Sequence, residues 1–388
     1  MSLRTRAEAR LEELDQQNLR RRLRTIQSPQ SAWVEIDGVR VLGLCSNNYL
    51  GLADHPTLLA AARASLDKDG LGAGASRLVS GTMEAHAEAE AALAAFLGTE
   101  DAVLFSTGYA ANVGTLGALA GPGTLVFSDA LNHASLIDGC RLSRAEVRVF
   151  RHRDLDHLES ELRDHRGRAD QALVVTDSVF SMDGDEADLR GLRTLCDRFD
   201  AALLLDEAHA VGVFGLGGRG LAAEAGVEAD LVVGALGKAF GAAGSFVATS
   251  KPVADLIRNR ARSFVFSTAP LPLAARVATA AAALVRDADD RRATVLGHAL
   301  RLRTELRRLG YEVPDGRAPI VPVVVGDEAP TLRLAADLLE RRVFAQAIRP
   351  PTVPRGTARL RVVPIATHSD TDLTLALAAF AEARHGSR

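Results

Sequence analysis

A chain of 388 residues is too long for one small hydrophobic core and can form two or three domains. Hydrophobic residues make up 47% of it, charged residues 24%, and the formal net charge is −3, which indicates a soluble globular protein and argues against a nucleic-acid binder. Three cysteines at no metal-binding or redox spacing, no apolar run of transmembrane length and no signal peptide predict a cytoplasmic protein without a metal site or membrane contact.

The first 46 residues are expected to form an N-terminal arm of one helix and one hairpin. Residues 5–24 carry charges of both signs and predict an exposed helix. Two apolar stretches, 33–36 and 39–42, flank Asp37-Gly38, and this pattern predicts the hairpin.

From residue 83 onward, helical and strand patterns alternate. The predicted helices include 83–97, 108–119, 155–163 and 189–199, and the predicted strands are 102–105, 124–127, 147–150, 173–176, 202–205, 231–233 and 246–249. This alternation indicates an α/β fold with a mainly parallel seven-stranded sheet flanked by helices, in a large domain that we expect to span residues 47–280. Such sheets bind ligands at the carboxyl ends of their strands.

After Pro272 the pattern changes to long helices and fewer strands. Helices are predicted over 272–287, 292–309 and 372–384, and strands over 320–325, 343–348 and 358–363, with a helix between the first two strands. We expect residues 281–388 to form a smaller C-terminal α+β domain.

The stretch 231–241 predicts a buried strand, a glycine-rich turn and then a helix, with Lys238 in the turn. Burial favours the neutral, nucleophilic form of a lysine, which can form a Schiff base with a carbonyl group. A structural lysine at the tip of a loop is the alternative interpretation.

Polar residues also follow the other predicted strands. Gly108 and Tyr109 open a helix whose backbone N–H groups suit a phosphate, and His133, Ser181, Asp206 and His209 follow later strands. Each of these residues has a purely structural explanation, such as a helix cap or a core histidine. Their convergence on one sheet edge favours a common site.

Pyridoxal phosphate (PLP) chemistry needs such a set of groups. Lys238 can bind the cofactor aldehyde, and Asp206 can keep the pyridine nitrogen protonated so that the ring accepts electrons. His209 can donate to the phenolic oxygen, His133 can cover the ring, and the helix opened by Gly108 can hold the phosphate.

Two motifs point to nucleotide binding instead. Residues 203–209 resemble a DEAH box, but no phosphate-binding Gly-x-x-x-x-Gly-Lys-Ser/Thr motif precedes them. Residues 215–220 match the spacing of a dinucleotide fingerprint, but no strand leads directly into them and Gly226 interrupts the following helix. A nucleotide-dependent motor or dehydrogenase is therefore the less favoured alternative.

The motifs together resemble those of the α-oxoamine synthases, a family of fold-type I PLP enzymes. The matching stretches are Ser46-Asn-Asn-Tyr-Leu-Gly51, Gly70 to Gly81, Phe105-Ser-Thr-Gly-Tyr109, Asn132-His-Ala-Ser135, Asp177-Ser-Val-Phe-Ser-Met-Asp-Gly184, Asp206-Glu-Ala-His209, Gly237-Lys238 and Phe266-Ser-Thr268. They span nearly the whole chain. The resemblance implies a homodimer with composite active sites.

Within the family, the runs from Ala347 to Pro354 and from Gly356 to Arg361 resemble the branch that serves biotin biosynthesis. This resemblance implies that L-alanine condenses with a pimeloyl thioester of coenzyme A or acyl-carrier protein, with release of carbon dioxide and the free thiol carrier. The 5-aminolevulinate synthase branch shares part of the first run, and glycine C-acetyltransferases usually lack its Arg-Pro-Pro-Thr segment. Both remain alternatives.

The resemblance also implies a role for each site residue. Lys238 would bind the cofactor covalently and remove the α-proton of alanine, Asp206 would pair with the pyridinium, His209 with the phenolic oxygen, and His133 would stack on the ring. Gly108, Tyr109 and Thr268 would hold the phosphate, Thr268 from the neighbouring subunit, and Ser181 would lie against the cofactor. Arg349 would bind the alanine carboxylate, and Arg20, Asn47 and Thr352 would contact substrate or thioester.

Ala235 departs from the family pattern, which has Thr or Ser three residues before the lysine. The missing hydroxyl is expected to loosen the phosphate unless water or Ser267 replaces it. A catalytically silent protein of the same fold is therefore a further alternative.

Overall fold

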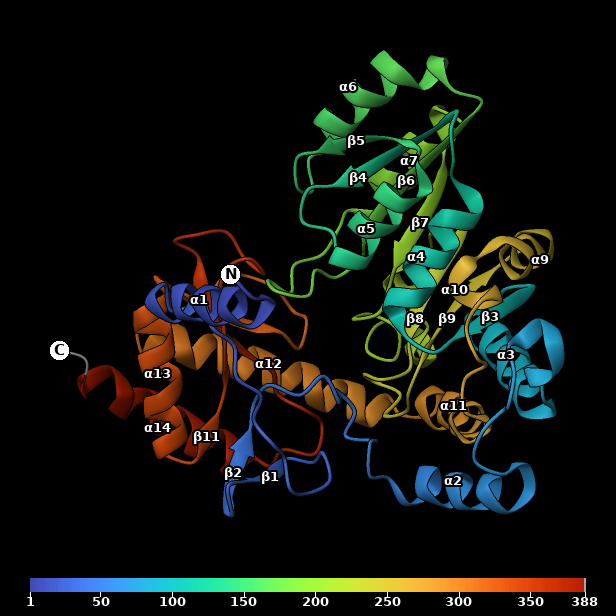
Figure 1. Cartoon of the computed structure of the whole chain (residues 1–388). Helices are drawn as coiled ribbons and strands as arrows, with labels where there is room; N and C mark the ends of the chain where they lie inside the picture. The colour runs from blue at the N-terminus through green and yellow to red at the C-terminus, as the bar shows by residue number, and fades with distance from the viewer. Residues whose placement is uncertain (387–388) are drawn as a thin grey trace. The chain divides into compact units, whose positions relative to one another are not determined.

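The computed structural model describes residues 1–386 and divides into two compact units (Figure 1). The first unit combines Met1–Asn47 with Met182–Gly184 and the chain from Thr294 onward, and the second combines Asn48–Ser181 with Asp185–Ala293. Each unit has its own hydrophobic core, built from side chains that are far apart in the sequence.

The second unit is organised by a seven-stranded sheet with the strand order β3-β9-β8-β7-β6-β4-β5. Only β9 runs antiparallel to its neighbours, β3 and β8, and the remaining pairs are parallel. The predicted mainly parallel sheet and all seven of its strands are thus confirmed. The strands are β3 (Asp101–Phe105), β4 (Thr124–Asp129), β5 (Glu146–Phe150), β6 (Gln171–Asp177), β7 (Ala202–Asp206), β8 (Leu231–Ala235) and β9 (Ser245–Thr249).

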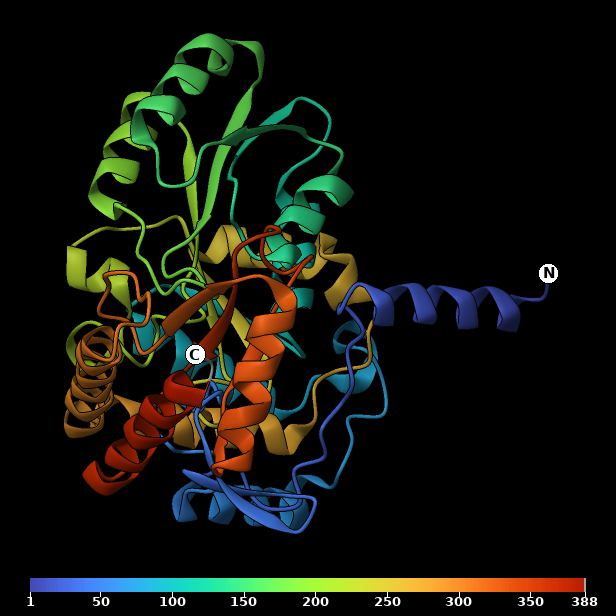
Figure 2. The ribbon, with the colours of Figure 1, turned by 90° about the vertical axis from the view of Figure 1, so that its left-hand side faces the viewer.

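Helices cover both faces of this sheet. On one face α4, α5 and α9 share a core cluster with the strands, and α6 and α7 lie on the opposite face (Figures 1 and 2). The α-helices are α2 (Pro56–Asp69), α3 (Glu84–Leu97), α4 (Gly108–Leu119), α5 (Ala134–Ser143), α6 (Leu155–His165), α7 (Leu189–Arg198), α8 (Leu221–Ala225), α9 (Lys251–Arg260), α10 (Arg262–Val265) and α11 (Pro272–Arg286). Three short helical turns are η1 (Arg77–Gly81), η2 (Arg166–Arg168) and η3 (Leu216–Gly218).

Side-chain caps explain where two of the helices next to the sheet begin. The hydroxyl of Thr107 accepts a hydrogen bond from the N–H of Ala110 at 3.1 Å and starts α4 directly after β3. The carboxylate of Asp188 accepts from the N–H of Gly191 at 3.0 Å and starts α7. The first cap fixes the turn that opens onto the carboxyl edge of the sheet.

The glycines of residues 215–220 wrap a buried carboxyl group, that of Glu207. Gly220 has a φ of +100°, and a Cβ there would lie 2.0 Å from Glu207 Oε2. The other carboxyl oxygen of Glu207 accepts from the N–H of Ala222 at 2.9 Å. The helix that follows, α8, has five residues. The glycine spacing is therefore explained by packing around Glu207, without a dinucleotide.

The first unit contains two three-stranded sheets, ordered β1-β2-β11 and β10-β13-β12. The predicted hairpin is present, and its turn residues Asp37 and Gly38 have φ values of 51° and 74°, as a tight two-residue turn requires. The prediction of one strand over 343–348 is wrong, because Ala345 separates two short strands that join different sheets. The strands are β1 (Trp33–Ile36), β2 (Val39–Gly43), β10 (Val321–Gly326), β11 (Val343–Phe344), β12 (Gln346–Ile348) and β13 (Ala358–Val362).

Four helices complete this unit: α1 (Leu3–Gln16), α12 (Asp289–Arg308, which begins in the second unit), α13 (Glu328–Glu340) and α14 (Asp370–Gly386). The prediction of a helix to residue 24 is wrong, because α1 ends at Gln16 and Asn18 takes a left-handed φ of 57°. No residue of α1 is buried, and the helix extends away from the rest of its unit (Figure 2).

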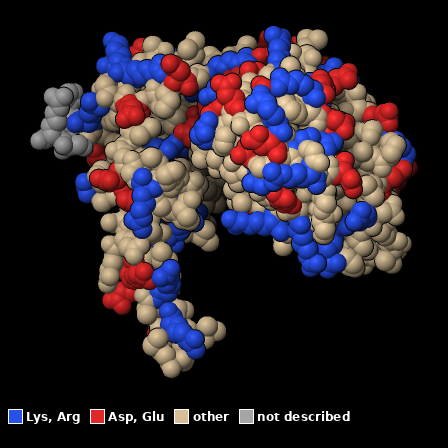
Figure 3. All heavy atoms as spheres, turned by 90° about the horizontal axis from the view of Figure 1, so that it is seen from above, with Lys and Arg blue, Asp and Glu red and all other residues tan. Residues whose placement is uncertain are grey.

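Charged side chains of both signs lie on the surface (Figure 3), in line with the 46 basic and 49 acidic residues of the sequence. Figure 3 shows acidic and basic side chains interspersed over the face seen from above. Among residues 1–386, no helix is both long and apolar enough to cross a bilayer.

Candidate active site

Lys238 lies in the turn between β8 and β9. The expectation of a helix after this lysine is wrong: the N–H of Leu236 donates to Gly244 O at 3.0 Å, and the chain turns directly into the antiparallel strand β9. Gly241 has a φ of +62°, and a Cβ there would lie 2.4 Å from the carbonyl carbon of Leu52. A tightly packed turn thus presents the lysine.

The amine of Lys238 belongs to a chain of three polar groups. Its Nζ lies 2.8 Å from His209 Nε2, and the other ring nitrogen of His209 lies 2.6 Å from the hydroxyl of Tyr49. The backbone reinforces this contact, because Gly212 has a φ of +89° and a Cβ there would lie 2.5 Å from the Cβ of Ala239. The loop after β7 and the turn after β8 are therefore packed against each other.

Asp206, the last residue of β7, is buried and has neutral hydrogen-bond partners. Its Oδ2 accepts from Asn112 Nδ2 at 2.7 Å, and its Oδ1 accepts from the N–H of Ala208 at 2.9 Å. Asn112 also donates to Ser135 Oγ at 2.9 Å, and its own Oδ1 is buried without a hydrogen-bond partner among the described residues. This environment leaves the carboxylate charge of Asp206 available to a cationic group such as a protonated pyridine.

His133 lies at the N-terminus of α5, near both charged groups. Its Nδ1 is 2.7 Å from Ser135 Oγ, and its backbone N–H donates to Asp177 Oδ2 at 2.8 Å. Burial lowers the pKa of His133, while the charge of Asp206 raises it and that of Lys238 lowers it. The structure therefore brings Lys238, His209, Asp206 and His133 together at the carboxyl edge of the sheet.

The predicted phosphate-binding residues occupy the same unit. Gly108 and Tyr109 form the first turn of α4, and the hydroxyl of Tyr109 donates to Asp138 at 2.5 Å. Ser181 is half-buried in the turn after β6. Thr268 is exposed and pairs with Ser76 in an isolated bridge.

Ala235 is buried at the end of β8, opposite Ser245 of β9. The hydroxyl of Ser245 donates to the carbonyl oxygen of Gly234 at 2.6 Å. The side chain at position 235 thus offers no donor to a phosphate, as expected from the sequence.

Three of the four predicted substrate residues line one cavity in the first unit. This cavity, of about 960 Å³, contains Arg20, Arg349 and Thr352, and Arg21, Arg22 and Arg24 also line it. Its only acidic lining residues are Asp15 and Asp37, and α13 provides an apolar wall. The cavity therefore suits a ligand that combines an anionic group with an apolar part.

The guanidinium of Arg349 is already bound within this cavity. It donates to the carbonyl oxygen of Asn18 and, at 3.4 Å, to that of Arg20, while Arg21 donates to Thr352 Oγ1 at 2.9 Å. Burial and the neighbouring Arg21 lower the pKa of Arg349. Asn47 lies elsewhere in this unit and accepts from Arg361 at 2.9 Å.

Two residues of the site were missed from the sequence, Tyr49 and Asn112. Tyr49 is one of three tyrosines and stands among polar residues. Asn112 is a polar residue inside an otherwise small and apolar helix, and it is 1% exposed. That contrast is a signal that could have identified Asn112, because buried amides need specific partners.

Comparison with known proteins identifies the class of protein to which this fold and site belong. The model of the family "Aminotransferase class I and II" matches residues 39–380, and the chain belongs to this family.

Particular relatives narrow the comparison. A protein of Geobacter sulfurreducens named 8-amino-7-oxononanoate synthase is 48% identical over 375 residues, which cover 96% of each chain. Serine palmitoyltransferase from Sphingomonas wittichii is 34% identical, with a TM-score of 0.95 over 100% of this chain and 99% of that chain. A serine palmitoyltransferase variant from S. paucimobilis, solved with bound PLP, is 31% identical with a TM-score of 0.93 over the same shares. The predicted fold class is confirmed.

Proposed function

We propose that this chain is an 8-amino-7-oxononanoate synthase, a PLP-dependent acyltransferase of biotin biosynthesis. It condenses L-alanine with a pimeloyl thioester of coenzyme A or acyl-carrier protein and releases carbon dioxide and the free thiol carrier. The observation that carries this proposal is the 2.8 Å contact between Lys238 and His209, next to a buried Asp206 with neutral partners. The 48% identity to the Geobacter synthase favours this branch over the serine palmitoyltransferases, at 34% and 31%.

The residues of the second unit fit PLP by their chemistry. Lys238 would bind the aldehyde, Asp206 the pyridine nitrogen and His209 the phenolic oxygen, while Gly108, Tyr109 and Thr268 would hold the phosphate and Ser181 would lie against the cofactor. When bound, PLP withdraws electrons from the α-carbon of an amino acid. Asp206 maintains this effect because its negative charge keeps the pyridine nitrogen protonated.

The remaining steps depend on side chains of this protein. Arg349 exchanges the carbonyl oxygens of Asn18 and Arg20 for the alanine carboxylate, since a guanidinium binds carboxylates through two parallel hydrogen bonds. The Nζ of Lys238 takes the α-proton, and the α-carbon then bonds to the carbonyl carbon of the thioester. The carbon–sulfur bond breaks and the thiol leaves. The carboxylate is then lost as carbon dioxide, and a proton returns to the α-carbon. His133 positions the acyl group, and Arg20, Asn47 and Thr352 contact the thioester or the substrate.

We further propose that the enzyme acts in the cytoplasm as a homodimer with composite sites. Large apolar side chains near Thr268 support a second copy: Val79 is 80% exposed, Phe266 72% and Leu78 56%. The three cysteines are free, and burial raises the pKa of Cys45 and Cys196 to about 12, so these two thiols stay protonated and unreactive at neutral pH.

Replacement of Lys238 by alanine tests the proposal. Lys238→Ala is expected to abolish turnover and the Schiff-base absorbance of the purified protein, because no other group can take both of its roles. Lys68→Ala is the matched control, since that exposed lysine lies in α2 and pairs with Glu84 at 2.6 Å, and it should leave both signals intact. Retained turnover in Lys238→Ala would refute the assignment.

A substrate panel tests the branch. Alanine, glycine and serine are each paired with pimeloyl, acetyl, succinyl and palmitoyl thioesters, on coenzyme A and on acyl-carrier protein. We expect the alanine and pimeloyl pair to give the highest kcat/KM. Preference for glycine with acetyl or succinyl thioesters would instead identify a glycine C-acetyltransferase or a 5-aminolevulinate synthase.

A further inference from the structure

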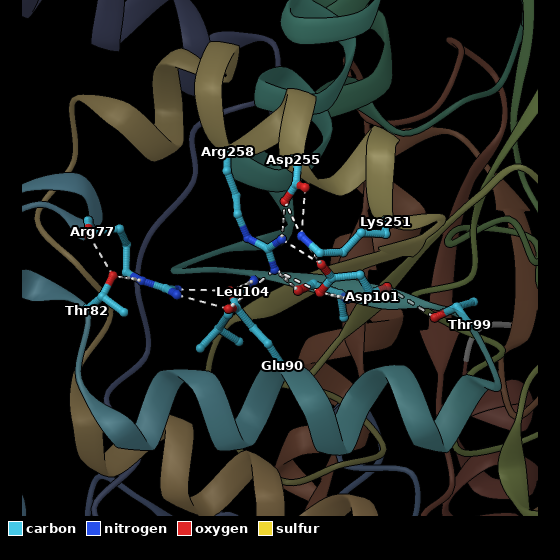
Figure 4. Close-up of polar contacts among 10 residues, drawn as sticks. Arg77, Thr82, Glu90, Thr99, Asp101, Leu104, Lys251, Asp255 and Arg258 are labelled. Carbon is cyan, nitrogen blue, oxygen red and sulfur yellow. Dashed lines mark hydrogen bonds and ion pairs between the residues drawn. The ribbon is translucent and has the colours of Figure 1, made fainter.

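A buried ion pair in the second unit links two segments that the proposed function assigns to phosphate binding. Arg77 and Glu90 form two hydrogen bonds of 3.0 and 2.9 Å, and their side chains are 5% and 9% exposed (Figure 4). A buried carboxylate is costly unless it is paired and hydrogen-bonded. Glu90 meets this requirement with a third contact, because its Oε1 also accepts from the N–H of Leu104 at 2.8 Å.

On one side of this pair, Arg77 fixes the turn η1. Its Nε donates to Thr82 Oγ1 at 3.0 Å, and Thr82 Oγ1 donates back to Arg77 O at 2.6 Å. The turn is closed tightly, since a Cβ on Gly81 would lie 2.1 Å from Ala75 O. The guanidinium also lies 5.2 Å from the centre of the Phe264 ring.

The segment that carries Thr268 is attached to this turn. Thr268 pairs with Ser76, and the N–H of Ala269 donates to Ala75 O at 2.9 Å. His86 Nε2 lies 2.8 Å from Pro270 O. Residues 264–270 therefore pack against the segment that Arg77 holds, and this segment positions Thr268.

On the other side of the pair, Glu90 fixes β3. Leu104, whose N–H it accepts, is the penultimate residue of this strand, and the turn to Gly108 and Tyr109 follows directly. One carboxylate thus holds both the strand that leads to the phosphate cradle and, through Arg77, the segment of Thr268.

We infer that Arg77 and Glu90 are positioning residues that set the affinity for the cofactor phosphate. This inference rests on the proposed function. The pair holds the cradle at Gly108–Tyr109 and the hydroxyl of Thr268 in a fixed relation. Where Thr268 serves the site of a second copy, the pair joins the phosphate contacts of two active sites through one subunit.

The test compares binding of PLP with binding of pyridoxal, which has the same ring and aldehyde but no phosphate. Cofactor-free protein is titrated with each compound, and the Schiff-base absorbance reports binding without any turnover. Arg77→Met is expected to raise the Kd for PLP about tenfold and to leave the Kd for pyridoxal within about twofold, because the pair acts only through the phosphate contacts. Thr268→Ala should raise the Kd for PLP by a similar factor. The Kd of the double variant should not exceed the larger of the two single-variant Kd values.

Arg276→Met is the matched control in the same unit. Arg276 forms a comparable double contact with Asp69, at 3.0 and 3.2 Å, and the two side chains are 14% and 6% exposed. Among the interactions described for residues 1–386, it forms no hydrogen bond or ion pair with Glu90, with β3 or with residues 264–270. Its loss should lower stability but leave the preference for PLP over pyridoxal unchanged.

Three results decide the inference. Equal weakening of PLP and pyridoxal in Arg77→Met would overturn it, because the effect would then be a general loss of structure. Additive effects of Arg77→Met and Thr268→Ala would also overturn it. If Arg77→Met does not fold, Arg77→Lys keeps the charge next to Glu90 but not the fork geometry, and a roughly threefold loss confined to PLP supports the inference. A wild-type protein that binds neither compound refutes the proposed function itself.

Discussion

The candidate residues of the two units are held in different ways. In the second unit, side chains hold one another: Lys238 contacts His209, which contacts Tyr49, and Asn112 holds Asp206. In the first unit, arginines face an open cavity and bind the backbone of the N-terminal arm. The first set is fixed by contacts among its own side chains, whereas the guanidinium of Arg349 is bound to backbone carbonyl oxygens.

Under the proposed function, this difference divides the residues of the chemical steps from the residues of substrate binding. Charges that are fixed before the reaction lower its barrier, because no reorganisation is needed during the step. Arginines that exchange a carbonyl oxygen for a carboxylate mainly set affinity. Variants of Lys238, His209 and Asp206 should therefore lower kcat, and variants of Arg349 should raise the KM for alanine.

The largest effect is expected from Asp206→Asn. The amide has nearly the same shape but no charge, so it cannot keep a pyridine nitrogen protonated. We expect kcat to fall by about 10³-fold or more, by analogy with the loss of a preorganised charge in other active sites, while the KM for alanine changes little. Steady-state kinetics of the cofactor-loaded protein measure both.

Asn112→Ala is the companion variant, because it removes the amide but leaves the carboxylate charge. It should lower kcat by a smaller factor of about ten. An Asp206→Asn protein that keeps kcat within about threefold of wild type would remove Asp206 from the chemistry and with it the contrast between the two units.

The sequence predicts the second unit better than the first for a physical reason. In a parallel sheet, residues just after the strands must meet at one edge, so Asp206, His209, Gly108 and His133 could be grouped from strand positions alone. The partners Tyr49 and Asn112 are 160 and 94 residues away from the side chains they contact, and no local pattern records such contacts.

The N-terminal arm shows the same limit of prediction from local sequence patterns. Mixed charge continues to residue 24 and predicted a longer helix, but α1 ends at Gln16. Beyond it, the chain follows contacts with Arg349 and Thr352, which are more than 300 residues away. Local charge patterns cannot report these contacts.

A second, smaller effect is expected from Arg349→Ala. Loss of the guanidinium should raise the KM for alanine by about ten- to a hundredfold and change kcat little, because a bidentate carboxylate contact contributes to binding. Initial rates over a range of alanine concentrations measure this.

Arg22→Ala is the matched control in the same cavity, since its side chain is 76% exposed. It should leave the KM for alanine unchanged. If Arg349→Ala also leaves that KM unchanged, Arg349 only anchors the arm through Asn18 and Arg20, and the carboxylate is bound by another group.

The smallest effect concerns the free energy of unfolding, through a buried carboxyl group of the second unit. Glu207 directly follows Asp206, and burial raises its pKa to about 7, with a smaller rise from Asp206. A carboxyl group whose pKa is raised in the folded state makes its full contribution to stability below its pKa in the unfolded state, which is near 4.5. This contribution is lost as the pH rises through about 7. Glu207→Gln keeps an acceptor for the N–H of Ala222 but cannot ionise. Relative to wild type, the free energy of unfolding of the variant should rise by about 1–2 kcal/mol between pH 5 and pH 8, measured by urea unfolding at both values.

Glu224→Gln is the control, because Glu224 is an exposed carboxylate that accepts from the N–H of Gly215. It should keep the wild-type difference in stability between the two pH values. An identical pH dependence in Glu207→Gln and wild type would show that the burial of Glu207 does not lower the free energy of unfolding between pH 5 and pH 8.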